Sequence, residues 1–118
     1  MKVKEFYAAS NYAPVSYQRI TMYYSIMGDN PLPTKRPDWE CLLTLYHEYT
    51  TVFDQLNEEE QTIIKRQFIN KERVNDVMND MGLKPSAYRR RQLSARQKLA
   101  AGLNASPCFQ RLEITFTA

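Results

Sequence analysis

The chain has 118 residues and a formal net charge of +3. This length is enough for one domain with a single core and too short for two. Its 43% hydrophobic and 12% aromatic residues exclude a chain that is disordered throughout. Because no run of 18 apolar residues occurs, we expect a cytoplasmic protein with no membrane partner.

In chain order, the first predicted element is a helix that begins with Ser16 as its N-cap, after Pro14, and closes at Gly28. Its apolar side chains recur at helical spacing: Tyr17, Ile20, Tyr24 and Met27. The segment from Asp29 to Pro37 contains three prolines and predicts a loop, since proline removes a helical hydrogen bond.

A long amphipathic helix is predicted from residue 38 to residue 56. Its apolar stripe is wide and aromatic: Trp39, Leu42, Leu45, Tyr46, Tyr49, Val52, Phe53 and Leu56. Two roles for this stripe stay open. It can face the core of its own chain, or it can bind a partner helix or a second copy of the chain in a homodimer.

Two shorter helices follow. The first opens with Asn57, and Glu60 stands three residues later, the spacing at which each side chain accepts a hydrogen bond from the other residue's backbone N–H. The second ends at Gly82, which suits the left-handed position after a helix. Its apolar stripe consists of Val74, Val77, Met78 and Met81.

A third helix is predicted from residue 85 to residue 103, with Pro85 at its first position, where a missing N–H costs nothing. One narrow sector holds the residues expected to pack on the other two helices: Tyr88, Gln92, Ala95, Leu99 and Leu103. The opposite sector holds Ser86, Arg90, Leu93, Ser94 and Gln97, and the flanks hold Arg89, Arg91, Arg96 and Lys98. A helix, a turn with glycine and a basic helix form the pattern of a helix-turn-helix whose second member enters the major groove.

Charge is segregated along the chain. Between Met81 and Leu112 there is no acidic residue, but there are seven basic ones: Lys84, Arg89, Arg90, Arg91, Arg96, Lys98 and Arg111. The rest of the chain holds 9 basic residues against all 13 acidic residues. Such segregation is typical of a nucleic-acid binder, and a solvated basic helix face is the alternative explanation.

The segment DVMNDMGLKPSAYRRRQLSARQKLA resembles the helix-turn-helix of region four of sigma factors, in the variant of the ArpU family of phage and prophage transcriptional regulators. The resemblance extends from Leu56 to Leu103, although Lys84-Pro85 stands where such proteins usually have a serine cap. The matching residues are Val77, Met81, Gly82, Leu83, Tyr88, Arg89, Arg90, Ala95, Leu99, Ala100 and Leu103. The resemblance implies promoter DNA of a phage or prophage operon as the target, RNA polymerase as a second partner, and a bacterial host cell as the location.

The C-terminal residues allow two structures. Asn104 to Pro107 is predicted to stop the third helix, and Leu112, Ile114 and Phe116 then alternate with polar residues. This alternation suits a short strand or an extended tail packed on the core. A strand would need a partner, either Met1 to Tyr7 or its own copy in a second chain.

Together these elements predict an all-α, mainly helical fold in one compact domain. Its parts are an N-terminal helical extension (1–56), a helix-turn-helix (57–103) and a C-terminal tail or short strand (104–118). We expect no enzyme and no cofactor, because the chain has only 3 glycines and neither a phosphate-binding loop nor an HExxH motif. Cys41, Cys108 and His47 lack the spacing of metal ligands.

The leading hypothesis is a sequence-specific transcriptional regulator that contacts double-stranded promoter DNA with the helix 85–103. Ser86, Arg89 and Arg90 stand where base edges can be contacted. Phosphate contacts are assigned to Lys84, Arg91, Arg96 and Lys98, and Gln97 completes the predicted DNA-binding set.

Two other hypotheses remain. The first is a mobile-element protein that keeps the helix-turn-helix fold but binds and inhibits or modulates a host protein, either RNA polymerase or a defence effector. Eight tyrosines favour it, because tyrosine is enriched at protein interfaces. The second is a phage packaging subunit that uses a similar motif on viral DNA.

Overall fold

The computed structural model describes the backbone of residues 11–27 and 37–118, and the side chains of residues 11–22 and 44–118. These residues form helices and no strand, so the all-α prediction is confirmed. The helices are α2 (Ala13–Met27), α3 (Pro37–Asp54), α4 (Glu58–Ile63), the π-helix η1 (Ile64–Ile69), α5 (Val74–Asp80), α6 (Pro85–Asn104) and α7 (Pro107–Arg111). None of the helices in the described ranges has both the length and the apolar character that a membrane span requires.

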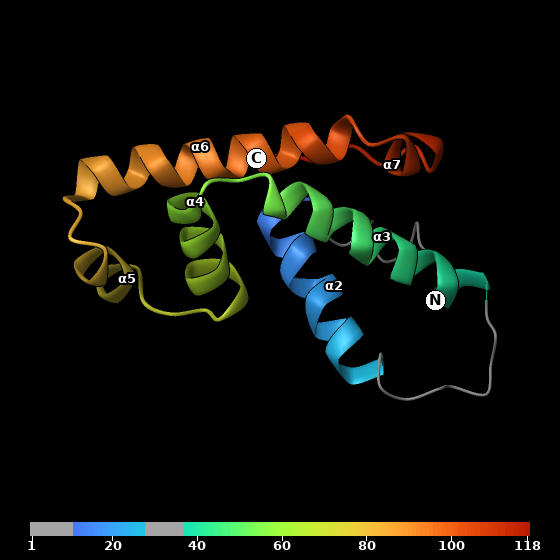
Figure 1. Ribbon diagram of the computed structural model, residues 1–118, viewed down its shortest axis with the longest axis horizontal. Coiled ribbons are helices and arrows are strands. Elements are labelled where there is room, and N and C mark those ends of the chain that lie inside the picture. The colour runs from blue at the N-terminus through green and yellow to red at the C-terminus, as the bar shows by residue number, and fades with distance from the viewer. Residues whose placement is uncertain (1–10, 28–36) are drawn as a thin grey trace.

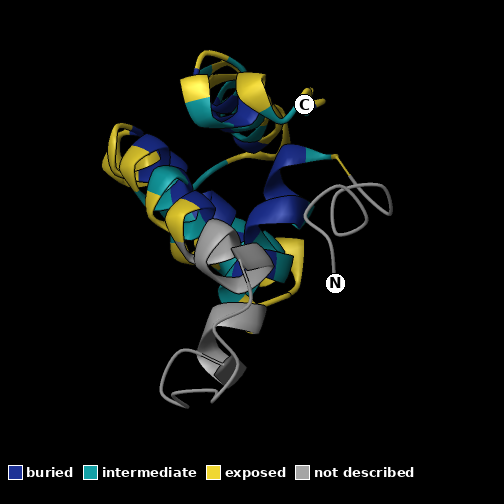
Figure 2. Cartoon of the chain, turned by 90° about the vertical axis from the view of Figure 1, so that its right-hand side faces the viewer, coloured by how far each residue is buried: buried dark blue, intermediate teal, exposed yellow. Residues whose placement is uncertain are grey.

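The arrangement is organised along α6, which lies along the top of the molecule in Figure 1, roughly parallel to its long axis. α5 lies near its first residues, and α7 follows its last. α4 packs against α6, while α2 packs against both η1 and α3. Buried residues lie mainly on the sides by which the helices face one another (Figure 2).

α2 begins before the predicted cap. Its first residue is Ala13, and Ser16 is buried within the first turn. The C-terminal tail explains the earlier start, because the carbonyl of Thr117 accepts a hydrogen bond from the N–H of Ala13 at 2.9 Å. Pro14 has no N–H and so needs no partner in the first turn. The predicted end at Gly28 and the loop that follows lie outside the described residues.

α3 matches the predicted long helix, and the described part of its aromatic stripe faces the chain's own core. The buried members are Leu45, Tyr49, Val52, Phe53 and, just beyond the helix, Leu56. Tyr17 of α2 stacks on Phe53 with ring centroids 5.1 Å apart. This part of the stripe is therefore occupied within one chain, while the side chains of Trp39 and Leu42 lie outside the described residues.

The capping box at the start of α4 is confirmed. Oδ1 of Asn57 accepts a hydrogen bond from the N–H of Glu60 at 2.8 Å, and Oε1 of Glu60 accepts one from the N–H of Asn57 at 3.1 Å. α4 then continues directly into the π-helix η1, which the sequence analysis did not predict. Phe68 and Ile69 of η1 pack against the main core.

α5, a turn and α6 follow in the predicted order. Gly82 has φ +65°, and the N–H of Leu83 donates to the carbonyl of Met78 at 3.0 Å, the bond that closes a helix at such a glycine. Val77 is buried, but Val74 is 40% exposed. The apolar stripe is thus narrower than predicted, because Val74 is the first residue of a short helix and lies outside the buried cluster.

Of the two structures predicted for residues 112–116, the extended tail is confirmed and the short strand does not form. Residues 107–111 form α7, and the chain beyond it is an extended tail with one isolated parallel bridge between Tyr12 and Thr117. Asn104 fixes this tail, because its Nδ2 donates to the carbonyl of Phe116 at 3.0 Å and its Oδ1 accepts from the N–H of Phe116 at 2.7 Å. The alternation of apolar residues reflects burial of Phe116 in the core, as in the extended-tail alternative.

Two clusters of buried side chains hold the described helices together. The larger joins α2, α3, η1, α6, α7 and the tail. At one end of it Tyr49, Phe109 and Phe116 meet edge to face, with ring centroids 4.9 to 5.7 Å apart. The smaller cluster joins α4, α5 and α6 and consists of Ile63, Val77 and Tyr88. α6 contributes to both clusters, so one helix couples the helix-turn-helix to the main core.

Candidate nucleic-acid interface

α6 is held in the fold by the face that its apolar spacing predicts. Of the predicted packing residues, Gln92 is half-buried and the others are buried: Tyr88, Ala95, Leu99 and Leu103. Pro85 lies in the first turn, preceded by Lys84 with extended backbone and no side-chain cap. A 20-residue helix fixed along one face presents its opposite face as a rigid surface.

A polar contact fixes the start of α6 against η1. Oη of Tyr88 donates to Oε1 of Gln67 at 2.6 Å, and Nε2 of Gln92 donates to the same oxygen at 2.7 Å. Burial raises the pKa of Tyr88, so its hydroxyl remains a donor at neutral pH. Two donors that converge on one oxygen set the rotation of α6 about its axis.

Arg66 of η1 fixes the end of α5 beside the turn. Nη2 of Arg66 lies 2.8 Å from Oε1 of Glu72 and 2.7 Å from Oδ2 of Asp80. Hydrogen bonds from Arg66 lower the pKa of the Glu72 carboxyl, even though burial opposes them. Sequence spacing does not reveal this cluster, because its members come from three separate segments.

Six of the eight predicted DNA-binding residues are exposed. Lys98 is paired with Glu60, and we call the other five the outer face of α6: Lys84, Ser86, Arg89, Arg90 and Gln97. Within the described part of the chain, none of these side chains forms a hydrogen bond or an ion pair. Arg89 and Arg90 stand in the first two turns of the helix. A guanidinium with no partner inside the protein keeps all of its donors for a ligand.

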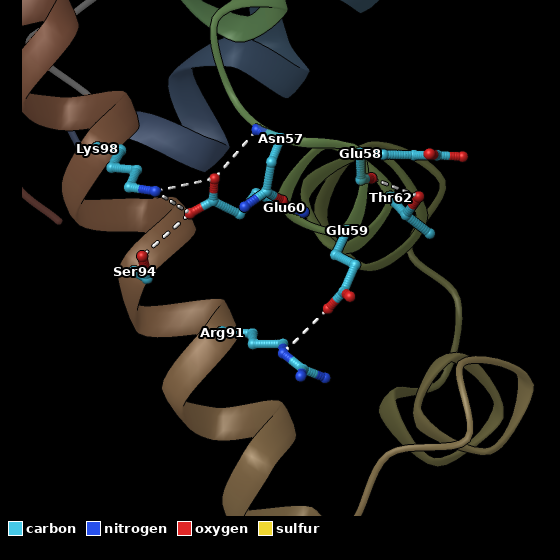
Figure 3. Close-up of polar contacts among 8 residues, drawn as sticks. All are labelled: Asn57, Glu58, Glu59, Glu60, Thr62, Arg91, Ser94 and Lys98. Carbon is cyan, nitrogen blue, oxygen red and sulfur yellow. Dashed lines mark hydrogen bonds and ion pairs between the residues drawn. The ribbon is translucent and has the colours of Figure 1, made fainter.

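Arg91 and Lys98 are engaged by α4. Nε of Arg91 lies 2.9 Å from Oε2 of Glu59, and Nζ of Lys98 lies 3.0 Å from Oε2 of Glu60 (Figure 3). From the sequence, Glu60 was predicted only as part of the capping box, and neither ion pair was predicted. The available signal was an acidic run and a basic helix in two elements predicted to pack together.

Ser94 was predicted to lie in the exposed sector opposite the packed face of α6, but it contacts α4 instead. Its Oγ donates to Oε2 of Glu60 at 3.0 Å, because α4 covers this flank of α6 (Figure 3). Glu60 is only 3% exposed. Burial opposes its ionisation, but the hydrogen bonds from Asn57, Lys98 and Ser94 and the charge of Lys98 outweigh burial and lower the pKa of Glu60.

An open hollow of about 400 Å³ lies between the start of α4 and the middle of α6. Its lining consists of Asn57, Glu58, Glu59, Glu60, Arg91, Ser94 and Lys98. Both basic groups in the hollow are paired with carboxylates across it. The hollow therefore belongs to the polar contact between α4 and α6, and it offers no unpaired cation to a phosphate.

Arg96 points towards Tyr12, the residue before α2, rather than to the outer face. Its Nη1 donates to Oη of Tyr12 at 3.2 Å. Its Nε is buried, and among the described residues it has no hydrogen-bond partner. This position separates Arg96, predicted as a phosphate contact, from Arg89 and Arg90 in the predicted DNA-binding set.

The tyrosines in the sequence favour a protein partner, but those whose side chains are described lie mainly inside the fold. Tyr17, Tyr49 and Tyr88 are buried, and Tyr12 and Tyr46 are half-buried. Core packing explains these five without an interface.

In comparison with known proteins, no protein-family model, curated sequence or solved structure matches this chain.

Proposed function

We propose that this chain is a sequence-specific, DNA-binding transcriptional regulator of phage or prophage origin that contacts promoter DNA through α6. The supporting observation is the outer face of α6, where Arg89 and Arg90 are exposed and have no partner among the described residues. Duplex DNA supplies the acceptors that these donors lack, on phosphates and on base edges. The phage origin, RNA polymerase as a partner and a bacterial cytoplasm rest on the sequence resemblance.

The dimensions of α6 suit the major groove. The groove is about 12 Å wide and admits one α-helix. The opposite face of α6 is buried in both clusters, so its outer face can approach the bases without unfolding any part of the core. In a helix-turn-helix, residues near the start of the second helix contact the base edges, and Ser86, Arg89 and Arg90 lie in the first two turns of α6.

The contacts divide into base and phosphate contacts. Arg90 lies opposite the buried sector, and we assign it to O6 and N7 of a guanine. Lys84, at the start of the helix, is assigned to a phosphate. Arg91 and Lys98 can reach phosphates only by exchanging a carboxylate of α4 for the DNA.

The experiment is selection of duplexes from a randomised pool, followed by affinity measurements over a range of salt concentrations. The parent should select one sequence, and its log affinity should fall linearly with log salt. Arg90→Ala should lose about 1–3 kcal/mol on the selected duplex and relax the preference at one base pair. Arg111→Ala is the matched control, because it removes the same charge from α7, at the opposite end of α6 from the turn (Figure 1).

A parent that binds no duplex at low salt would contradict the proposal. So would an Arg89→Ala/Arg90→Ala double variant that binds the selected duplex as tightly as the parent. Binding to a host protein would then become the leading hypothesis. Capture from a bacterial lysate, with purified RNA polymerase as a reference, would test it.

The homodimer stays a prediction, because one α6 covers a single half-site. The described part of the α3 stripe is buried within one chain, so those side chains are not available to a dimer. Sedimentation at micromolar concentration that shows only a 13.9 kDa species would remove this prediction and leave the DNA-binding proposal intact.

A further inference from the structure

Leu93 is an exposed hydrophobic residue in the middle of the outer face of α6. It is 42% exposed, and among the described residues only Met22 and Val74 are comparable. A single exposed leucine needs no explanation by itself. What distinguishes Leu93 is its position between Arg90, one turn earlier, and Gln97, one turn later, both of which are exposed.

An apolar side chain among cations and amides matches one feature of duplex DNA. In the major groove, thymine presents a C5 methyl group, which apolar side chains contact. The flanking arginines complement the charge of the phosphates. A protein partner fits less well, because the apolar core of a protein interface is built from several adjacent side chains, whereas Leu93 has charged and polar neighbours.

We infer that Leu93 is a specificity-determining residue and that it contacts the C5 methyl group of a thymine in the major groove. The inference rests on the proposed function and deepens it by naming a base. An α-helix rises about 1.5 Å per residue, which places Leu93 about 4.5 Å along α6 from Arg90. Base pairs are stacked about 3.4 Å apart. The thymine therefore lies within about two base pairs of the guanine that Arg90 contacts.

The test uses the duplex selected by the parent, with each thymine replaced in turn by deoxyuridine, which lacks only the methyl group. The parent should bind about fourfold more weakly when one particular thymine is replaced, the change expected for one buried methyl group. Leu93→Ala should bind the two forms of that duplex equally. Leu93→Met keeps an apolar side chain and should retain most of the discrimination.

Val74→Ala is the matched control, because Val74 is similarly exposed but lies at the start of α5. It should discriminate between thymine and deoxyuridine as the parent does. If the parent binds its selected duplex but discriminates at no position, the inference fails and the proposed function stands. The inference also fails if Leu93→Ala keeps the discrimination at the same position. If the parent selects no duplex, both the inference and the proposed function are contradicted.

Discussion

Lys98 and Glu60 form a 3.0 Å ion pair in which the glutamate side chain is 4% exposed and the lysine side chain 57% exposed. The sequence predicted Lys98 as a phosphate contact, yet its ammonium group already has a carboxylate partner. If Lys98 moved to a phosphate, Glu60 would lose a hydrogen bond and the charge that favours its ionised form. We therefore regard Lys98 first as a link between α6 and α4.

Glu60 should make the fold sensitive to acid. Its pKa is lower in the folded chain than the usual glutamate value of 4.5, so its contribution is fully present above pH 4.5 and is lost as the pH falls through the folded value. Glu60→Gln should unfold at lower urea concentration than the parent at pH 7. The difference in stability should shrink as the pH falls below 4.5. A difference that stays constant down to pH 3 would show that the ionised carboxylate contributes nothing.

Glu59 should weaken DNA binding under the proposed function. The side chains of Glu59 and Arg91 are 54% and 42% exposed, so their pair contributes only about 0–1 kcal/mol to stability. Glu59→Gln should therefore unfold nearly as the parent does. It should raise affinity for the selected duplex and steepen the salt dependence by about one unit, because Arg91 becomes available to a phosphate.

Glu58→Gln is the control for this effect. It removes the same charge from the neighbouring position. Among the described residues, Glu58 forms no ion pair with a basic side chain. Its salt dependence should match that of the parent. Equal changes in both variants would mean that overall charge, and not release of Arg91, governs the affinity.

The sequence predicted those elements whose signals are local. The Asn57–Glu60 capping box, the left-handed Gly82 and Pro85 at the start of α6 each act within a few residues, and the structure has all three. At residues 112–116 the sequence left a strand and an extended tail open, because alternation of apolar residues does not reveal a partner strand. In the fold, the side chain of Asn104 forms hydrogen bonds with the N–H and the carbonyl of Phe116, the groups with which a neighbouring strand would pair.

The candidate site was predicted only in part for a related reason. Helical spacing identified the buried face of α6 and the exposed Arg89 and Arg90 correctly. It could not show which flank a second helix covers. Ser94 and Lys98 contact Glu60 instead, and Arg96 contacts Tyr12.

Tyr88 offers a stability test of the helix-turn-helix that does not depend on DNA. Tyr88→Phe removes the hydrogen bond to Gln67 but keeps the buried ring, so the free energy of unfolding should fall by about 0.5–1.5 kcal/mol. Tyr88→Ala also removes the ring and should cost about 3–5 kcal/mol. Urea denaturation followed by circular dichroism measures both. Equal costs would mean that Tyr88 contributes through its hydroxyl and hardly through packing.

The last prediction concerns the close approach of α6 to α3 at Gly102. A Cβ atom at this position would lie 2.5 Å from Cγ1 of Val52, which is itself buried. In a free helix, alanine is more favourable than glycine by about 1 kcal/mol. Here overpacking, which costs about 1–3 kcal/mol, should outweigh that preference. Gly102→Ala should therefore lower the free energy of unfolding, although it replaces a poor helix former with the best one.

A double-mutant cycle with Val52→Ala separates the clash from other causes. Val52→Ala alone should destabilise by leaving a cavity. In that background Gly102→Ala should be neutral or stabilising, because the added methyl group enters the vacated space. Gly82→Ala is the control, since Gly82 has φ +65° and no atom within 4 Å of an added Cβ, so its cost is backbone strain and should not depend on residue 52. If Gly102→Ala costs the same with Val52 and with alanine at that position, steric contact with Val52 is not the reason for the glycine.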